Sequence, residues 1–281
     1  MDQLIVYELS EFSSLAGDNF ILGSFESFHL GHYQLFKQAM ANGGRVILVC
    51  FNAQKGMPKF NDSIFTDNYA KYEQLARLPL DAIVQLDFNE VKNYEGIEFL
   101  AKLAQGNYVT FIAGQDFRFG NKAAYTLSDF SAPDYEDLFR VQEIELMQDI
   151  RTKISTSTLK ESLEFGDIDF INSLLVYDYS FSGVLKEDAL ETIPQLAKIH
   201  AGLYCTLFHI KELVYYGILH VTKNGVRKVF LIGYQLNDSV QDTIVVSELK
   251  HKIRVAVSNF DDEITTDDIA LAKDYFARNK K

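Results

Sequence analysis

Cysteine, positive charge and long apolar runs are all scarce in this chain of 281 residues. Only Cys50 and Cys205 are present, far apart in the sequence, so neither a disulfide framework nor a thiolate zinc cluster can be built. The 27 Lys and Arg residues face 39 Asp and Glu residues, which gives a formal net charge of −12. This balance argues against a nucleic-acid-binding surface, which needs a basic face. An acidic protein can still bind a small anionic ligand in a locally positive pocket.

No apolar run approaches the length that crosses a membrane. The first ten residues lack a basic segment followed by a long apolar one, and we expect no signal peptide. A hydrophobic content of 47% and a charged content of 23% are typical of globular proteins. We therefore expect a soluble, cytoplasmic protein with neither a membrane nor a nucleic acid as partner.

The first part of the chain alternates between buried strands and amphipathic helices. The strands are continuous apolar runs, which are typical of parallel strands covered on both faces. This β-α-β alternation predicts an α/β fold with a Rossmann-like, doubly wound parallel sheet. The expected strands are 19–24, 45–51, 82–86 and 108–113, and the expected helices are 33–40, 69–78 and 95–105.

The pattern changes near residue 180, and we place a domain boundary at about 176–182. Strand-like runs joined by turn signals follow, and they predict a small antiparallel β-barrel or sandwich. A last helix begins near Thr265 with acidic residues in its first turn. The expected strands are 181–185, 203–210, 214–221, 228–234, 243–246 and 252–257, and the inward residues of the helix are Ile269, Leu271, Ala272, Tyr275 and Phe276.

The segment Gly23–His32 (GSFESFHLGH) carries two histidines, His29 and His32, three positions apart. It lies between an expected strand and an expected helix, where ligands bind in open α/β sheets. The helix start offers N–H groups to an anion, the imidazoles add hydrogen bonds, and Gly31 permits close approach of the backbone. The segment therefore predicts a phosphate site. Alone, the two histidines also fit a surface pair or half of a metal site.

Two later segments add chemistry of the same kind. Gly114–Gly120 (GQDFRFG) follows an expected strand, and its rings can cover a flat heterocycle while its carboxylate accepts a hydrogen bond. A tight loop with Phe117 and Phe119 in the core explains these residues equally well. Ile154–Lys160 (ISTSTLK) opens an expected helix, and its hydroxyls and lysine can bind a polyphosphate. Taken alone, this segment is better explained as a helix cap followed by a solvated lysine than as a phosphate site.

In their order and spacing, the three segments resemble those of the bacterial bifunctional riboflavin kinase/FAD synthetase family. That family has the motifs G-x-F-D-G-x-H-x-G-H, G-x-D-F-x-F-G and I-S-S-T-x-x-R in a nucleotidyltransferase domain, followed by a riboflavin kinase barrel. The resemblance implies a nucleotidyltransferase domain at 1–178 and a kinase-like barrel domain at 179–281. It further implies an FMN adenylyltransferase, which transfers AMP from ATP to FMN and releases pyrophosphate and FAD.

The resemblance also implies partners and residue roles. The substrates would be ATP and FMN, with Mg²⁺ bridging the phosphates and no side chain assigned to the metal. The histidines would hold the α and β phosphates and stabilise the charge of the transition state. The implied groups are His29, His32 and Lys160 for catalysis, these three with Ser24, Phe25, Thr156 and Ser157 for ATP, and Phe51, Asp116 and Phe119 for the flavin.

Several positions depart from the family pattern. Glu26-Ser27 stands in place of Asp-Gly, and Lys160 replaces an arginine and loses its bidentate fork. In the barrel, the P-T-A-N segment is absent from 191–198, and the strand expected to carry a catalytic glutamate, 227–234, has no carboxylate. A hydroxyl cannot be activated by a missing base, so we expect a retained barrel without kinase activity.

Two alternatives to FAD synthesis stay open at this point. One is a nucleotidyltransferase that acts on another phosphate acceptor, because the flavin-side residues are changed. The other is a flavin- or nucleotide-binding regulator that has lost efficient catalysis, although the retention of both histidines favours an enzyme. The sequence does not determine the oligomeric state.

Overall fold

The computed structural model of the chain describes residues 4–55, 63–145, 148–149 and 152–279. The chain divides into two compact units, and each is described by itself. The first unit consists of Met1–Asp62 and Tyr72–Lys153, and the second of Ser63–Lys71 and Ile154–Lys281. The division into family domains at residue 178 stays a prediction.

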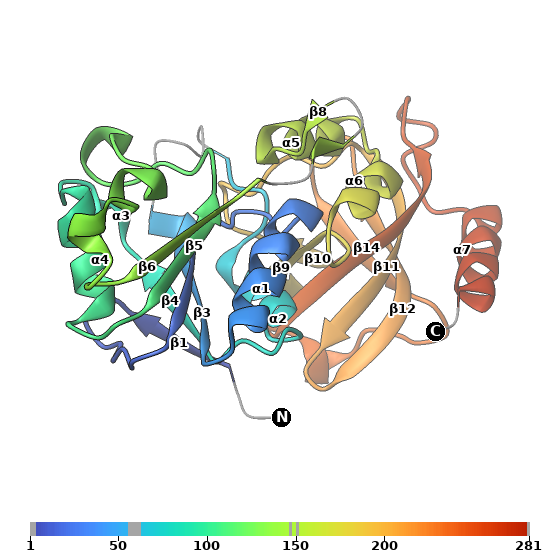
Figure 1. Cartoon of the computed structure of the whole chain (residues 1–281). Helices are drawn as coiled ribbons and strands as arrows, with labels where there is room; N and C mark the ends of the chain where they lie inside the picture. The colour runs from blue at the N-terminus through green and yellow to red at the C-terminus, as the bar shows by residue number, and fades with distance from the viewer. Residues whose placement is uncertain (1–3, 56–62, 146–147, 150–151, 280–281) are drawn as a thin grey trace. The chain divides into compact units, whose positions relative to one another are not determined.

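The first unit contains a six-stranded sheet in the order β1-β4-β3-β2-β5-β6, and every neighbouring pair is parallel. The expected α/β fold with a parallel sheet is confirmed (Figure 1). The strands are β1 (Ile5–Glu8), β2 (Asn19–Leu22), β3 (Val46–Phe51), β4 (Ala82–Leu86), β5 (Thr110–Gly114) and β6 (Arg140–Ile144). Its helices are α1 (Leu30–Asn42), α3 (Phe88–Val91) and α4 (Gly96–Ala104). The helix α2 (Asn68–Leu75) begins in the segment assigned to the second unit and ends in the first unit.

The sequence did not predict the two edge strands of this sheet. β1 (IVYE) and β6 (RVQEI) contain no fully buried residue, whereas all four residues of β2 are buried. An edge strand is covered less than a central one, so its sequence lacks the continuous apolar run that identified the others.

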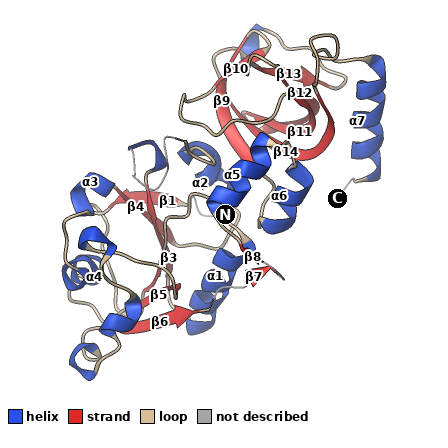
Figure 2. Cartoon of the chain, turned by 90° about the horizontal axis from the view of Figure 1, so that it is seen from above, coloured by secondary structure: helices blue, strands red, loops and turns tan. Residues whose placement is uncertain are grey.

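Helices cover both faces of the sheet (Figures 1 and 2). α1 lies on one face, where its residues Leu35, Phe36 and Ala39 are buried. α3 and α4 lie on the other face, and Phe99, Leu100 and Leu103 of α4 join the core beneath β2, β3 and β4. α1 is longer than the expected 33–40 and ends at its C-cap Gly43, whose φ of 73° is a conformation that glycine adopts without strain.

β2 is the strand at which the direction of winding changes. Its neighbours are β3 on one side and β5 on the other, with Phe20 paired to both Ile47 and Phe111. Successive strands after β2 extend the sheet on the β3 side, and β5 and β6 extend it on the other. The carboxyl ends of β2 and β5 therefore flank the topological switch point, where open α/β sheets bind ligands.

The second unit contains a closed barrel in the order β10-β13-β12-β11-β14-β9, which confirms the antiparallel barrel. The strands are β9 (Ser180–Lys186), β10 (Ala189–Glu191), β11 (Gly202–Ile210), β12 (Leu213–Val221), β13 (Arg227–Leu231) and β14 (Ile244–Val255). The runs expected at 243–246 and 252–257 belong to the single strand β14, whose middle includes the buried polar residues Ser247 and Glu248. β13 ends at Leu231 because a turn with Gly233 at φ 80° follows.

Three helices accompany the barrel: α5 (Thr156–Glu164), α6 (Ile168–Leu174) and α7 (Thr266–Arg278). The inward face of α7 is narrower than expected, because Ala272 and Phe276 are buried whereas Leu271 is 56% exposed. Outside the sheet and the barrel, β7 (Gln148–Asp149) and β8 (Thr152–Lys153) form a short pair of strands. The structure also has 3₁₀ turns, at Ala53–Lys55, Asn121–Ala123, Leu127–Phe130, Pro133–Tyr135 and Asp238–Val240. Among the described residues, no helix is both long enough and apolar enough to cross a membrane.

Asp268 connects α7 to the barrel. Its carboxylate accepts hydrogen bonds from Arg254 Nε at 2.8 Å and Arg254 Nη2 at 2.9 Å, and it forms a capping box with Thr265. Burial would raise the pKa of Asp268, but the hydrogen bonds from Arg254 and Thr265 outweigh this effect and lower it to about 2. The carboxylate is therefore charged in the folded protein at pH values where a free carboxylate is protonated.

Asp268→Asn should lower the free energy of unfolding at pH 7 by about 1–3 kcal/mol, because it removes the charge that pairs with Arg254. The folded pKa is lowered from 3.8, so this stabilisation is complete above about pH 4 and is lost as the pH falls through about 2. Urea unfolding followed by circular dichroism measures both effects. The control is Asp267→Asn at an exposed position of the same turn, for which we expect a change within about 0.5 kcal/mol. Equal stability of both variants at pH 7 would contradict the assignment.

Candidate functional site

His29 is the N-cap of α1. Its Nδ1 accepts a hydrogen bond from the backbone N–H of His32 at 3.3 Å. Because Nδ1 is the acceptor, the proton of the neutral imidazole is on Nε2, which makes Nε2 a donor. The histidine therefore begins the helix directly after the β2 loop, at the helix end that attracts anions.

The two imidazoles of the segment form a stack. The ring centroids of His29 and His32 lie 3.7 Å apart with an interplanar angle of 18°. The ring of His32 also contacts Phe25 at 4.7 Å and Phe28 at 6.0 Å between centroids. The structure therefore brings together the two histidines that the sequence singled out, in one cluster at the carboxyl end of β2.

Phe25 lies inside this cluster rather than on its surface. Its side chain is 1% exposed, and its φ angle is +43°, which is uncommon for a bulky residue. The opposite wall is Gly23, where a Cβ atom would lie 2.7 Å from two atoms of the Phe25 ring. The ring is held between Gly23 and His32, so only the backbone of Phe25 is placed to contact a ligand.

The residues that replace the Asp-Gly of the family motif are buried. Glu26 is 4% exposed and Ser27 is 2% exposed, and both take part in interactions within the chain. Ser24 is half-buried in the same loop. The loop therefore keeps a compact form without the glycine that the family uses at position 27.

The loop after β5 carries the second predicted group. Asp116 is exposed, whereas Phe119 is 6% exposed and packs against Phe99 and Phe130 in the core. Phe117 is half-buried and stacks on Phe119 at 5.9 Å between centroids. This loop begins at the same edge of the sheet as the histidine loop because β2 and β5 are parallel neighbours. A flavin-binding role for Asp116 and Phe119 stays a prediction.

Phe51 is the last residue of β3, the other neighbour of β2. It is half-buried, and its ring lies 6.1 Å from that of Phe88 in an edge-on contact. Its position at the carboxyl end of β3 puts it at the same sheet edge as the histidine cluster. Its role as a wall of the flavin site stays a prediction.

Thr156, Ser157 and Lys160 belong to the second unit, in the first turns of α5. The N-cap of this helix is Ser155, whose hydroxyl accepts a hydrogen bond from the N–H of Thr158 at 3.2 Å. Lys160 Nζ donates a hydrogen bond to the carbonyl oxygen of Ser63 at 2.6 Å. The histidine cluster belongs to the first unit, so joint action of the two groups on one ATP molecule stays a prediction.

The segment Ser63–Lys71 packs with the barrel, which the sequence did not predict. Ile64 forms a parallel bridge with Leu196, with hydrogen bonds of 2.7 Å from Ile64 N to Gln195 O and from Ala197 N to Ile64 O. Asp67 accepts hydrogen bonds from the backbone N and the hydroxyl of Ser182 at 2.6 and 2.7 Å. A bridge of single residues has no periodicity, so no pattern in the sequence could have identified this contact.

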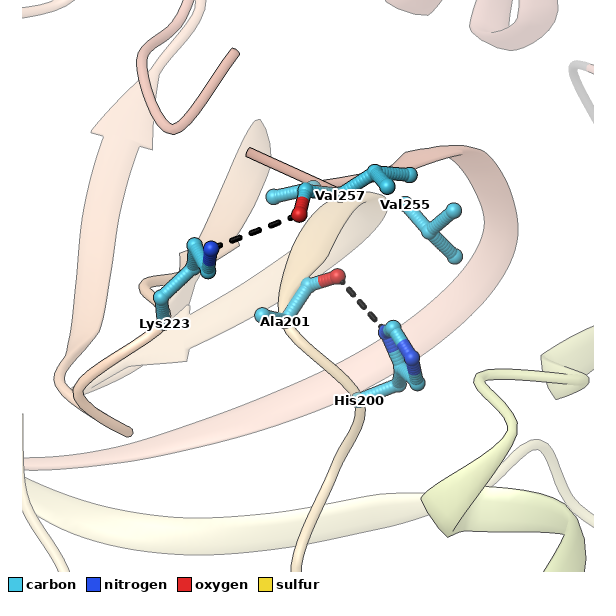
Figure 3. Close-up of a pocket in the computed structure, with 6 residues that line it drawn as sticks. His200, Ala201, Lys223, Val255 and Val257 are labelled. Atoms are coloured by element: carbon cyan, nitrogen blue, oxygen red, sulfur yellow. Dashed lines mark hydrogen bonds between the residues drawn. The ribbon is translucent and has the colours of Figure 1, made fainter. Parts of the chain in front are cut away.

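A hollow of about 450 Å³ lies at one end of the barrel (Figure 3). Lys223 donates a hydrogen bond to the carbonyl oxygen of Val257 at 3.3 Å across it, and His200 Nδ1 lies 2.9 Å from the carbonyl oxygen of Ala201. None of the residues that the sequence assigns to catalysis or binding lines this hollow. In the described part of the chain, no group of three His, Cys, Asp or Glu residues is arranged to hold a metal ion.

The sequence model that describes the FAD synthetase family matches residues 13–158, which is more than half of the chain. The chain belongs to the FAD synthetase family. The matched span includes the histidine cluster, the β5 loop and the start of α5, but not Lys160. The expected family is therefore confirmed from the segments that suggested it.

Curated relatives of this FAD synthetase family member are similar over a little more than half of its length. A bifunctional riboflavin kinase/FMN adenylyltransferase of Buchnera aphidicola (Schizaphis graminum strain) is 30% identical over 177 residues, 58% of this chain and 55% of the relative. A protein of the same name from Bacillus subtilis is 26% identical over 174 residues, with the same shares. The chain spans about half the length of the curated relatives it matches.

The fold of this family member is also found in a solved structure. The crystal structure titled as a macrolide-efflux protein from Streptococcus pneumoniae superimposes with a TM-score of 0.77 and covers 99% of this chain and 100% of its own. The sequence identity is 19%, so this likeness shows the fold alone.

Gly23→Ala should disturb the histidine cluster from beneath. The added Cβ would lie 2.7 Å from the Phe25 ring, so the ring must move away from its place against His32. We expect the free energy of unfolding to fall by about 1–3 kcal/mol, together with shifted imidazole resonances of His32 in NMR spectra. Ser24→Ala changes the next residue without adding an atom and serves as the control. Unchanged His32 resonances in Gly23→Ala would show that Phe25 does not set the position of the imidazole.

Proposed function

We propose that the protein is an FMN adenylyltransferase that transfers AMP from ATP to FMN and releases pyrophosphate. The observation that carries the proposal is the placement of two family segments at one switch point. The histidine cluster follows β2 and the GQDFRFG loop follows β5, and these two strands are parallel neighbours. An FMN phosphate oxygen would attack the α-phosphorus of ATP in line, with cleavage of the bond to the β-phosphate oxygen as pyrophosphate leaves.

In this reaction the histidines stabilise charge rather than form a covalent bond. His29 is proposed to donate a hydrogen bond from Nε2 to a phosphate oxygen, and His32 to bind an adjacent one. The stacked rings, the N-cap contact and the buried Phe25 restrict the motion of both imidazoles. Donors fixed before the reaction need no reorganisation in the transition state, which supports catalysis by this pair.

The flavin is proposed to bind between the loops that follow β3 and β5. Asp116 is exposed and can accept a hydrogen bond from the flavin imide or from a ribityl hydroxyl. Phe51 is half-buried at the end of β3, on the other side of β2 from β5, and can offer part of its ring to the heterocycle. Phe119 is proposed to act from the core, as support for the loop that carries Asp116.

The remaining ATP contacts are proposed for Thr156, Ser157 and Lys160 at the start of α5. Ser155 caps the helix, and the hydroxyls of the next two residues lie in its first turn, at the helix end that attracts phosphate. Mg²⁺ is proposed to bind through the ATP phosphates and to offset their negative charge. Since ATP and FMN are small water-soluble substrates, we propose that the protein works in the cytoplasm.

We also propose that the barrel has no riboflavin kinase activity. β13 has Arg227 and Lys228 at its start and no carboxylate, so it offers no base for a riboflavin hydroxyl. The segment expected to carry the P-T-A-N motif instead pairs with Ile64 through Gln195, Leu196 and Ala197. These backbone groups are used within the protein, which supports a structural role for this part of the barrel.

His29→Ala and His32→Ala should each reduce pyrophosphate release with FMN and ATP by about 10²–10⁴-fold, because each removes a donor from the developing charge. The control is His251→Ala, which removes a histidine that pairs with Asp169 in the second unit and should leave turnover unchanged. Circular dichroism checks that each variant is folded. Turnover near that of the wild type in both site variants would refute the proposed reaction. Binding of FMN and ATP by the wild type without pyrophosphate release would instead favour a regulator.

Riboflavin, ATP and Mg²⁺ incubated with the full chain should yield no FMN, because the barrel lacks a base for the hydroxyl. In a parallel reaction with FMN as substrate, we expect FAD to accumulate. Chromatographic separation of the three flavins measures both reactions with the same protein preparation. FMN formation from riboflavin at a rate similar to that of FAD formation would show that the barrel is still a kinase.

A further inference from the structure

Arg227, at the start of β13, has a guanidinium group that is only partly compensated within the protein. Its Nη1 donates to the hydroxyl of Thr192 at 3.1 Å, and its Nη2 has a weak contact with the carbonyl oxygen of Ala197 at 3.5 Å. Its Nε atom is buried and has no hydrogen-bond partner among the described residues. No carboxylate in that part of the chain forms an ion pair with this guanidinium.

The environment of this charge is apolar. The guanidinium carbon lies 5.5 Å from the centroid of the Phe181 ring, a cation–π contact that offsets only part of the desolvation. Burial lowers the pKa of Arg227, with a smaller opposite effect from Tyr179. The residue as a whole is half-buried, and desolvating part of a guanidinium without a counter-charge is costly, so an anionic partner would stabilise an arginine at this place.

Tyr179 contributes a second unpaired polar group beside the same phenylalanine. Its ring centroid lies 6.3 Å from that of Phe181 and 4.8 Å from that of Phe65. The residue is 1% exposed, and its hydroxyl has no hydrogen-bond partner among the residues that the structure describes. Burial raises the pKa of Tyr179 while the charge of Arg227 lowers it. The hydroxyl therefore stays protonated at neutral pH and can donate a hydrogen bond to an anion.

The carboxylate of Asp67 raises the pKa of Tyr179, but its oxygens already accept hydrogen bonds from other groups. They accept hydrogen bonds from the backbone N of Ser182, from the hydroxyl of Ser182 and from the N–H of Ala70, at 2.6, 2.7 and 3.0 Å. Among the described residues, no hydrogen bond or ion pair joins Asp67 to Arg227. The carboxylate is therefore satisfied elsewhere and does not neutralise the guanidinium.

We propose that Arg227 and the Tyr179 hydroxyl form a binding site for one small oxyanion, the carboxylate or phosphate group of a ligand. The Nε–H and the remaining Nη hydrogens of the guanidinium can donate to two oxygens of such a group. The Tyr179 hydroxyl can donate to a third oxygen, or to one of the two that the guanidinium already binds. The site contains none of the residues proposed for adenylyl transfer, so it can be tested apart from that reaction. It gives the barrel a ligand-binding role that does not require a catalytic base.

The test compares thermal unfolding of the full chain in sodium phosphate, sodium acetate and sodium chloride at constant ionic strength, followed by circular dichroism and without FMN or ATP. A ligand that binds only the folded state raises the unfolding midpoint in a saturable way. For the wild type we expect a rise of about 2–4 °C with phosphate or acetate over chloride, the shift that about 1 kcal/mol of binding gives in a chain of this size, and the stronger of the two identifies the preferred group. This rise should disappear in Arg227→Gln and become smaller in Tyr179→Phe.

The matched control is Lys228→Gln, which removes the same charge from the next residue of β13, where Lys228 pairs with Asp188 at 3.1 Å on the surface. It should keep the full anion-dependent rise. The proposal is overturned if Arg227→Gln keeps that rise, or if neither oxyanion stabilises the wild type beyond chloride. Should Arg227→Gln fail to fold, Tyr179→Phe decides the question, because it removes one oxygen from a buried ring and leaves the charge in place.

Discussion

The candidate site depends on one constraint of parallel sheets: the loops that follow two neighbouring strands must leave the sheet at the same edge. β2 pairs with β3 on one side and with β5 on the other. The histidine segment, Phe51 and the GQDFRFG loop come from three different parts of the sequence, and all three lie at the carboxyl ends of these strands. The strand order alone therefore explains how distant segments gather at one place, before any side-chain contact is considered.

The central elements of the fold were predictable because their sequences carry strong periodic signals. The buried strands β2, β3, β4 and β5 are continuous apolar runs, and α1 presents Leu35, Phe36 and Ala39 on one face. The edge strands β1 and β6 were missed because half-buried strands mix polar and apolar residues. The three-residue strand β10 was missed because it is too short to show a period.

The site was predictable in composition and less so in geometry. The spacing of His29 and His32 at a strand-to-helix junction indicated a phosphate site, but nothing in the sequence indicates a stack of imidazoles over a buried Phe25 with a positive φ angle. That arrangement depends on the missing Cβ of Gly23 and on packing across the loop. In the same way, the sequence showed that β13 lacks a carboxylate, but only the packing shows that its first residue, Arg227, is a half-buried cation beside Phe181.

The path of the chain has a consequence for any attempt to study the two units apart. Ser63–Lys71 belongs to the barrel unit, although the chain on both sides of it belongs to the sheet unit. Cutting the chain once near residue 154 would leave the barrel without Ile64 and Asp67, and with them the backbone bonds to Gln195, Ala197 and Ser182. Neither unit is therefore a contiguous fragment of the sequence. To express the barrel alone, this nine-residue segment would have to be fused to the fragment that begins near residue 154 through an added linker.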